Sequence, residues 1–215
     1  QDIFYEDLRA EQGTTVSGRS TGLAYAILEG LAGLEPALEN SPFSNSLELV
    51  DAVFSVSAQD KTSEDSGTSL DSASLIVTYS PKRGGGLTTK DVYTIELKQL
   101  LTEGVSHTFF GGVGTNVALH GNTGIGTRYL PRSDVFLTLW GLADIKKNGT
   151  PLAEHAFVHF MITQGIRDEK NNLLSKQEDN DIETYLLVSS QDSKKLPFDG
   201  GFLYLFWSDV NFRQS

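Results

Sequence analysis

The fold is decided by residues 135–163, which read VFLTLWGLADIKKNGTPLAEHAFVHFMIT. Asn148-Gly149 at its centre tolerates the positive φ angles of a type I′ turn, so the stretch predicts a β-hairpin. The turn fixes a register. On one face it pairs Ile145 with Leu152, Leu139 with Val158, Leu137 with Phe160 and Val135 with Ile162. On the other face it pairs Trp140 with Phe157, Thr138 with His159 and Phe136 with Met161. Both faces of the hairpin are therefore rich in apolar side chains.

A hairpin that is apolar on both faces predicts cover on both sides. It lies at the centre of a sandwich, or one face lies under a loop, a ligand or another subunit. Six candidate binding or interface residues follow from this reasoning: Phe136, Trp140, His155, Phe157, His159 and Met161. The alternative is that this face is ordinary core beneath residues 1–40 or beneath the glycine-rich segment 111–126, and the sequence leaves both interpretations open.

The rest of the chain also favours strands. Apolar residues alternate or cluster at 47–56, 75–79, 93–97, 182–188 and 202–210. Twenty-one glycines and many Ser, Asn and Asp residues separate these stretches, which is typical of short strands joined by turns. We expect one domain over residues 1–215, an all-β, antiparallel β-sandwich of jelly-roll or immunoglobulin-like type, with about eight to ten strands and little helix.

The first part of the chain fits two structures. Residues 1–46 are interpreted as an N-terminal extension or edge segment of the domain. Leu23, Tyr25 and Ile27 alternate as in a strand, whereas Ala24–Leu38 also fits a short helix broken by glycine and proline. We favour a strand followed by a loop.

The charge of the chain disfavours one class of partner. Seventeen basic side chains against 28 acidic ones give a formal net charge of −11, which repels phosphate backbones and anionic lipid surfaces. We therefore expect no nucleic-acid partner, and no apolar run is long enough to predict a membrane span. The sequence begins at Gln1, which favours a removed signal peptide and a secreted, extracellular or periplasmic protein; a trimmed chain is the alternative.

The histidines offer no local metal motif. His155 and His159 have the spacing of a zinc-protease helix, but Ala156 follows His155 where that motif has its glutamate. In a strand, residues four apart stand about 13 Å from each other, too far to share one ion. A histidine site would therefore combine residues that are distant in the sequence, such as His107 or His120.

Acidic residues are the other candidate ligands. Glu178, Asp179, Asp181 and Glu183 form a run that offers oxygens to calcium, which binds about six to eight of them. The loop that contains Asp60 and Asp71 is a second such run. Neither has the spacing of an EF-hand, so we expect no cofactor, with calcium as the alternative.

Three functions are compatible with these features. The chain has no cysteine and no G-x-S-x-G motif, which favours a protein that is not an enzyme. The first hypothesis is an exported subunit of a surface or extracellular assembly, which binds protein and forms a homo-oligomer or polymer. The second is a carbohydrate- or small-ligand-binding module in which Trp140, Phe157 and two histidines line a pocket. The third is a hydrolase that uses acidic loop residues across a cleft.

Overall fold

The computed structural model describes residues 14–27, 44–62, 69–81, 91–102, 112–128, 130–190, 196–198 and 201–215, with the side chains of 178–180 excepted. These residues form antiparallel strands and no α-helix, which confirms the all-β prediction. The strands are β1 (Thr15–Ser20), β2 (Ala24–Ile27), β3 (Leu47–Gln59), β4 (Ser72–Ser80), β5 (Tyr93–Leu100), β6 (Val113–Gly114), β7 (Val117–Leu119), β8 (Ser133–Lys147), β9 (Thr150–Arg167), β10 (Leu173–Ser189), β11 (Phe202–Trp207) and β12 (Val210–Gln214). None of the described residues forms a helix able to cross a membrane.

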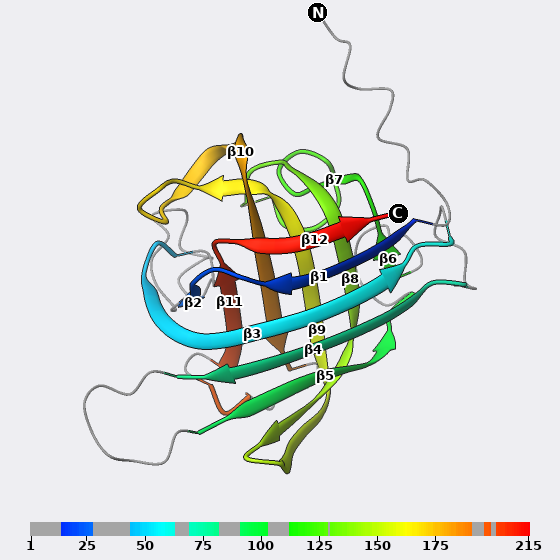
Figure 1. The fold of residues 1–215 in the computed structure, drawn as a ribbon, viewed down its shortest axis with the longest axis vertical. Coiled ribbons are helices and arrows are strands. Elements are labelled where there is room, and N and C mark those ends of the chain that lie inside the picture. The colour runs from blue at the N-terminus through cyan, green and yellow to red at the C-terminus, as the bar shows by residue number, and fades with distance from the viewer. Residues whose placement is uncertain are drawn as a thin grey trace, which may run out of the picture.

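The sheet closes on itself through β3. One edge of β3 pairs with β4, and the other pairs first with β2 and then with β1. The path from β3 through β4, β5, β8, β9, β10, β11 and β2 therefore returns to β3, and β12 pairs with β1. Figure 1 shows two layers, with β12, β1, β3, β4 and β5 crossing in front of β8 to β11. This arrangement confirms the sandwich-like fold.

The described residues contain twelve strands, more than expected, partly because two strands are interrupted. β1 stops before β2 at residues 21–23, and β11 stops before β12 at residues 208–209. Backbone hydrogen bonds join the two breaks, from Thr21 to Asp209 and from Ser208 to Leu23. The N-terminal strand prediction is confirmed at β2, so the helix alternative is wrong for residues 24–27, and 28–38 lie outside the described residues.

An apolar core fills the interior between the layers. Every second residue of β3 from Val50 to Ala58 is buried, as strand geometry requires. Phe54 of β3 contacts Phe160 and Trp207 from the other layer, with ring centroids 5.2 and 4.9 Å apart. The indole nitrogen of Trp207 donates to the Ala52 carbonyl at 3.0 Å, so its polar group is satisfied inside the core.

The hairpin and its turn are confirmed, but the predicted register is wrong. Asn148 and Gly149 have φ angles of 50° and 80°, and pairing starts with Lys147 opposite Thr150. Two irregularities before Ala156 each add one residue to β9. The pairs beyond them are shifted by two residues, with Leu139 opposite Phe160, Leu137 opposite Ile162, Trp140 opposite His159 and Thr138 opposite Met161. Because the shift is even, these residues keep the predicted faces.

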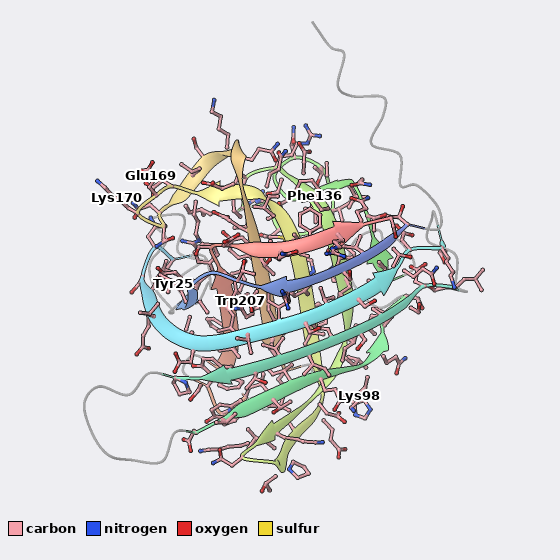
Figure 2. The ribbon with its side chains drawn as sticks, viewed as in Figure 1. Tyr25, Lys98, Phe136, Glu169, Lys170 and Trp207 are labelled. Carbon is pink, nitrogen blue, oxygen red and sulfur yellow. The ribbon has the colours of Figure 1, made fainter. Side chains whose placement is uncertain are left out.

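A third irregularity reverses the faces at the far end of the hairpin. Val135 pairs with Thr163 and Leu137 with Ile162, so Phe136 is an extra residue in β8. Phe136 consequently packs against the interior core, and its ring centroid lies 5.1 Å from that of Phe212. Figure 2 shows Phe136 beside β12. The prediction that Phe136 shares a face with Trp140 is therefore wrong.

A second apolar cluster lies on the outer face of β8 to β11. Its buried members include Trp140, Met161, Tyr185, Tyr204 and Phe206. The segment 112–130 runs across this face, because β6 and β7 pair with β8 and because Leu119 and Leu130 belong to the cluster. Away from its turn end, where residues 150–155 are largely exposed, the hairpin is thus covered on both faces, one in the interior and the other beneath the glycine-rich segment.

Candidate functional site

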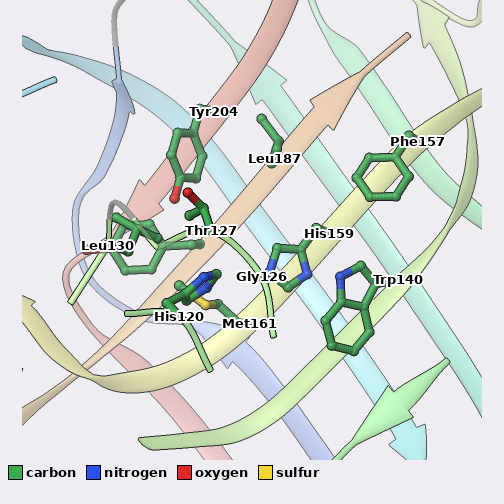
Figure 3. Close-up of a pocket in the computed structure, with 11 residues that line it drawn as sticks. His120, Gly126, Thr127, Leu130, Trp140, Phe157, His159, Met161, Leu187 and Tyr204 are labelled. Carbon is green, nitrogen blue, oxygen red and sulfur yellow. The ribbon is translucent and has the colours of Figure 1, made fainter. Parts of the chain in front are cut away.

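A pocket lies between the outer face of β8 to β11 and the covering loop, which is the part of segment 112–130 that follows β7. Its volume is about 320 Å³, at the lower end of the roughly 300–1,000 Å³ typical of small-molecule sites. Its lining side chains come from four strands and one loop, and Figure 3 shows them around the pocket. The lining residues are His120, Gly126, Thr127 and Leu130 from the loop after β7, Trp140 from β8, Phe157, His159 and Met161 from β9, Tyr185 and Leu187 from β10, and Tyr204 from β11.

Strand alternation builds the floor of the pocket. His159 and Met161 are two residues apart on β9 and share a face. Trp140 lies opposite His159, and their rings stack with centroids 5.0 Å and planes 10° apart. Nδ1 of His159 lies 3.2 Å from the Leu139 carbonyl oxygen, which can only accept a hydrogen bond, so Nδ1 carries the proton. In the neutral imidazole, Nε2 is then the nitrogen with a lone pair.

His120 enters the pocket from the covering loop. Its backbone is left-handed, with φ of 64°, and its N–H donates to the Ile125 carbonyl at 2.7 Å. The side chain is buried and meets His159 edge-on, with ring centroids 5.9 Å and planes 67° apart. Gly126 lies against the other side of His120, since a Cβ there would stand 2.6 Å from Nδ1 of the imidazole. The position of His120 therefore requires glycine at 126, where φ is 76°.

Two tyrosines, Tyr185 of β10 and Tyr204 of β11, also line the pocket. The Tyr185 hydroxyl donates to Glu183 Oε2 at 2.7 Å, and Glu183 also accepts the backbone N–H groups of Ile166 and Arg167. Burial raises the pKa of the Glu183 carboxyl, and it raises the pKa of the Tyr185 and Tyr204 phenols. Both phenols are therefore neutral at physiological pH. Among the described lining residues, none is Asp, Glu, Lys or Arg.

The structure brings together four of the six predicted site residues. Trp140, Phe157, His159 and Met161 line the pocket. Phe136 does not, because the bulge in β8 turns it to the interior core. His155 is exposed in the irregular part of β9, where its φ is 56°. These two residues are not part of the pocket lining.

The sequence suggested His120 only as a distant member of a histidine site, and the other residues that complete the pocket were missed; these are Gly126, Thr127, Leu130, Tyr185, Leu187 and Tyr204. The two-faced apolar pattern of residues 182–188 and 202–210 is the signal that could have identified the strand residues among them. No local pattern marks His120 as a partner of His159. That contact exists only because the segment after β7 folds over β9.

The structure describes the side chains of two of the four predicted calcium ligands, Asp181 and Glu183. Asp181 is exposed, whereas Glu183 is buried and uses both carboxylate oxygens in hydrogen bonds within the fold. The side chains of Glu178 and Asp179 lie outside the described part of the structure. Within that part, no three His, Cys, Asp or Glu side chains are placed to hold one metal ion. Calcium binding by this run stays a prediction, and His107 lies outside the described residues.

Comparisons with known proteins do not identify a relative. No family model matches the chain, and the comparisons with curated proteins and with solved structures gave no match. The function must therefore be argued from the chemistry of the site.

Proposed function

We propose that this protein binds a small, uncharged and largely apolar molecule in the pocket between β8 to β11 and the covering loop. The observation that carries this proposal is a cavity of about 320 Å³ lined mainly by aromatic and aliphatic side chains, with imidazole, hydroxyl and phenol groups at a few points. Such a combination of apolar walls and few polar groups is typical of small-molecule sites.

The lining favours a neutral ligand over a charged one. A charged organic group that enters an apolar pocket loses its hydration and, because it forms no coordination bonds with the lining, needs an opposite charge to compensate. The described lining residues include no Asp, Glu, Lys or Arg, so they offer no fixed opposite charge. The net charge of −11 further disfavours an anion at long range.

The geometry favours an apolar molecule over a carbohydrate. Sugar-binding sites need an accessible aromatic face on which a ring of the sugar packs. Trp140 is only 2% exposed, and one face of its indole is already covered by His159. Part of the hydrogen-bonding capacity of the lining is also used within the fold, because the Tyr185 hydroxyl donates to Glu183 and Nδ1 of His159 faces the Leu139 carbonyl oxygen.

The test is a titration with N-phenyl-1-naphthylamine, a neutral aromatic probe whose fluorescence rises in apolar surroundings. We expect saturable binding to the protein and about tenfold weaker binding to Phe157→Ala, because a buried aromatic contact is worth about 1–1.5 kcal/mol. Phe136→Ala is the matched control, since it removes a partly buried ring from the same hairpin but outside the pocket. Equal weakening by both substitutions, or no saturable binding at all, would contradict the proposal.

A role in assembly is the second candidate function. Among the described strands, β12 pairs only with β1, so its other edge is not paired within the described sheet. Strand edges of this kind can add a strand from another chain. Light scattering over a hundredfold range of protein concentration tests this function, with an oligomer as the expected result. A monomer at every concentration would contradict self-assembly.

The hydrolase interpretation receives no support from the pocket. A hydrolase of the expected type needs two carboxyl groups that face each other across the substrate. The described lining residues include no Asp or Glu. Hydrolysis by acidic loop residues therefore stays a prediction without a site.

A further inference from the structure

We infer that the pocket also binds a soft monovalent metal ion of the Cu(I) class, with His120, His159 and Met161 as its ligands. All three residues line the same pocket of about 320 Å³, and Figure 3 shows them from β9 and the covering loop. This inference goes beyond the binding of a neutral molecule, because it concerns a different chemical class of ligand.

The sulfur of this protein lies in the pocket. The chain has one methionine and no cysteine, so Met161 carries its only sulfur atom. Methionine is often a flexible filler of apolar cores. Here the thioether lies in the lining of a pocket that also contains two of the four histidines in the chain. Thioether and imidazole together form a ligand set that suits copper, and thioether sulfur favours its monovalent state.

His159 is oriented as a metal-binding histidine would be. Metal-binding histidines usually donate the N–H of the other ring nitrogen to a carbonyl or carboxylate, which fixes the tautomer and the ring. His159 has this arrangement, with Nδ1 3.2 Å from the Leu139 carbonyl oxygen and the ring stacked on Trp140. In this tautomer Nε2 is the nitrogen that would bind the metal.

The separation of the two imidazoles also fits one shared ion. Two imidazoles that bind one ion at about 2.0 Å from each nitrogen have ring centroids roughly 5–6 Å apart. The centroids of His120 and His159 are 5.9 Å apart. Met161 is two residues from His159 on the same face of β9, which places their Cα atoms about 6.6 Å apart. All three side chains line the same pocket, and the two on β9 are neighbours on one face of that strand.

The nature of the site selects against harder cations. Calcium and magnesium require oxygen ligands, and the described lining has no carboxylate to supply them. A single positive charge costs less to bury than a double one, and the net charge of −11 attracts cations to the protein. The site therefore favours a soft ion with one charge.

The test uses Ag(I), a redox-stable ion of the same class, in chloride-free buffer with isothermal titration calorimetry. We expect one ion per chain for the unmodified protein and at least tenfold weaker binding for Met161→Leu and for His159→Gln. Leucine keeps the volume and apolar character of methionine, so Met161→Leu removes the sulfur with little disturbance of the core. Cu(I), measured by competition with a chelator, is expected to follow the same order.

His155→Asn is the control, because His155 is an exposed histidine on the same strand. Its φ angle is positive, and asparagine tolerates such an angle. It is expected to bind Ag(I) as tightly as the unmodified protein. Equal Ag(I) binding by all variants, or none by the unmodified protein, would overturn the metal site. N-phenyl-1-naphthylamine titrations of the same variants keep the two proposals separate, because Met161→Leu is expected to retain the neutral probe.

Discussion

Gly126→Ala is expected to weaken the binding of both N-phenyl-1-naphthylamine and Ag(I) by at least tenfold. An added methyl group at this position would stand 2.6 Å from Nδ1 and 2.7 Å from Cε1 of His120. Contacts this short are not tolerated in a packed interior, so the imidazole must leave its place against His159. The neutral ligand then loses one wall of the pocket, and the metal ion loses one ligand.

Gly124→Ala is the matched control for this substitution. Gly124 and Gly126 lie in the same loop with φ angles of 81° and 76°, but nothing lies within 4 Å of a Cβ at Gly124. Alanine costs about 1–2 kcal/mol at either position, because both have left-handed backbone. Both variants are expected to lose a similar amount of thermal stability. Only Gly126→Ala is expected to bind the two ligands more weakly. If both variants bind as the unmodified protein does, His120 takes no part in either site.

The element type was predictable from the sequence, whereas the register was not. Alternation along β3 and the Asn148-Gly149 turn are local patterns, and each led to a correct strand or turn. The register of β8 and β9 depends on bulges, and no residue type marks where they occur. Two extra residues in β9 preserved the predicted faces, but one extra residue in β8 moved Phe136 to the opposite face.

The candidate site was predictable only where it lies on the hairpin. Trp140, Phe157, His159 and Met161 share one face because of strand alternation, which the sequence reveals. The cover could not be predicted in the same way, because glycine-rich segments show where a chain turns but not against what it packs. The contact between His120 and His159 depends on that packing.

The covering loop is also explained by the architecture of the sheet. The interior core protects only one face of β8 to β11, yet these strands carry large apolar residues on both. Without cover, outer residues such as Trp140 and Met161 would be exposed to water, which costs about 25 cal/mol for each Å² of apolar surface. The segment 112–130 covers them incompletely, and the space that remains is the pocket. The candidate site is thus a consequence of how the outer face is covered.

Asp60→Asn is expected to stabilise the protein by about 2 kcal/mol at pH 7. Asp60 follows β3 and is completely buried. Its Oδ2 accepts the N–H and the hydroxyl of Thr115 at 3.0 and 2.8 Å, whereas Oδ1 receives no hydrogen bond from any described residue. Burial, with a smaller contribution from the nearby charge of Asp71, raises the pKa of this carboxyl from 3.8 to about 6.

The direction of the pH dependence follows from this shift. Between about pH 4 and pH 6 the folded protein holds a proton on Asp60 that the unfolded chain has released, so stability falls as the pH rises through this range. At about 1.4 kcal/mol for each pKa unit, the loss is about 3 kcal/mol and is complete above pH 6. Asparagine keeps the acceptor for Thr115 and carries no charge, but its amide needs a partner, which reduces the expected gain to about 2 kcal/mol.

Urea unfolding at pH 4, 5, 6, 7 and 8 tests this expectation. The unmodified protein is expected to lose stability relative to Asp60→Asn as the pH rises, and the difference is expected to vanish near pH 4. Asp181→Asn is the control, because it removes the same charge from an exposed side chain of β10. If Asp60→Asn is instead the less stable protein at pH 7, the Asp60 carboxylate stabilises the fold as an anion. A stabilisation by added calcium that Asp60→Asn lacks would then identify the cation that compensates it.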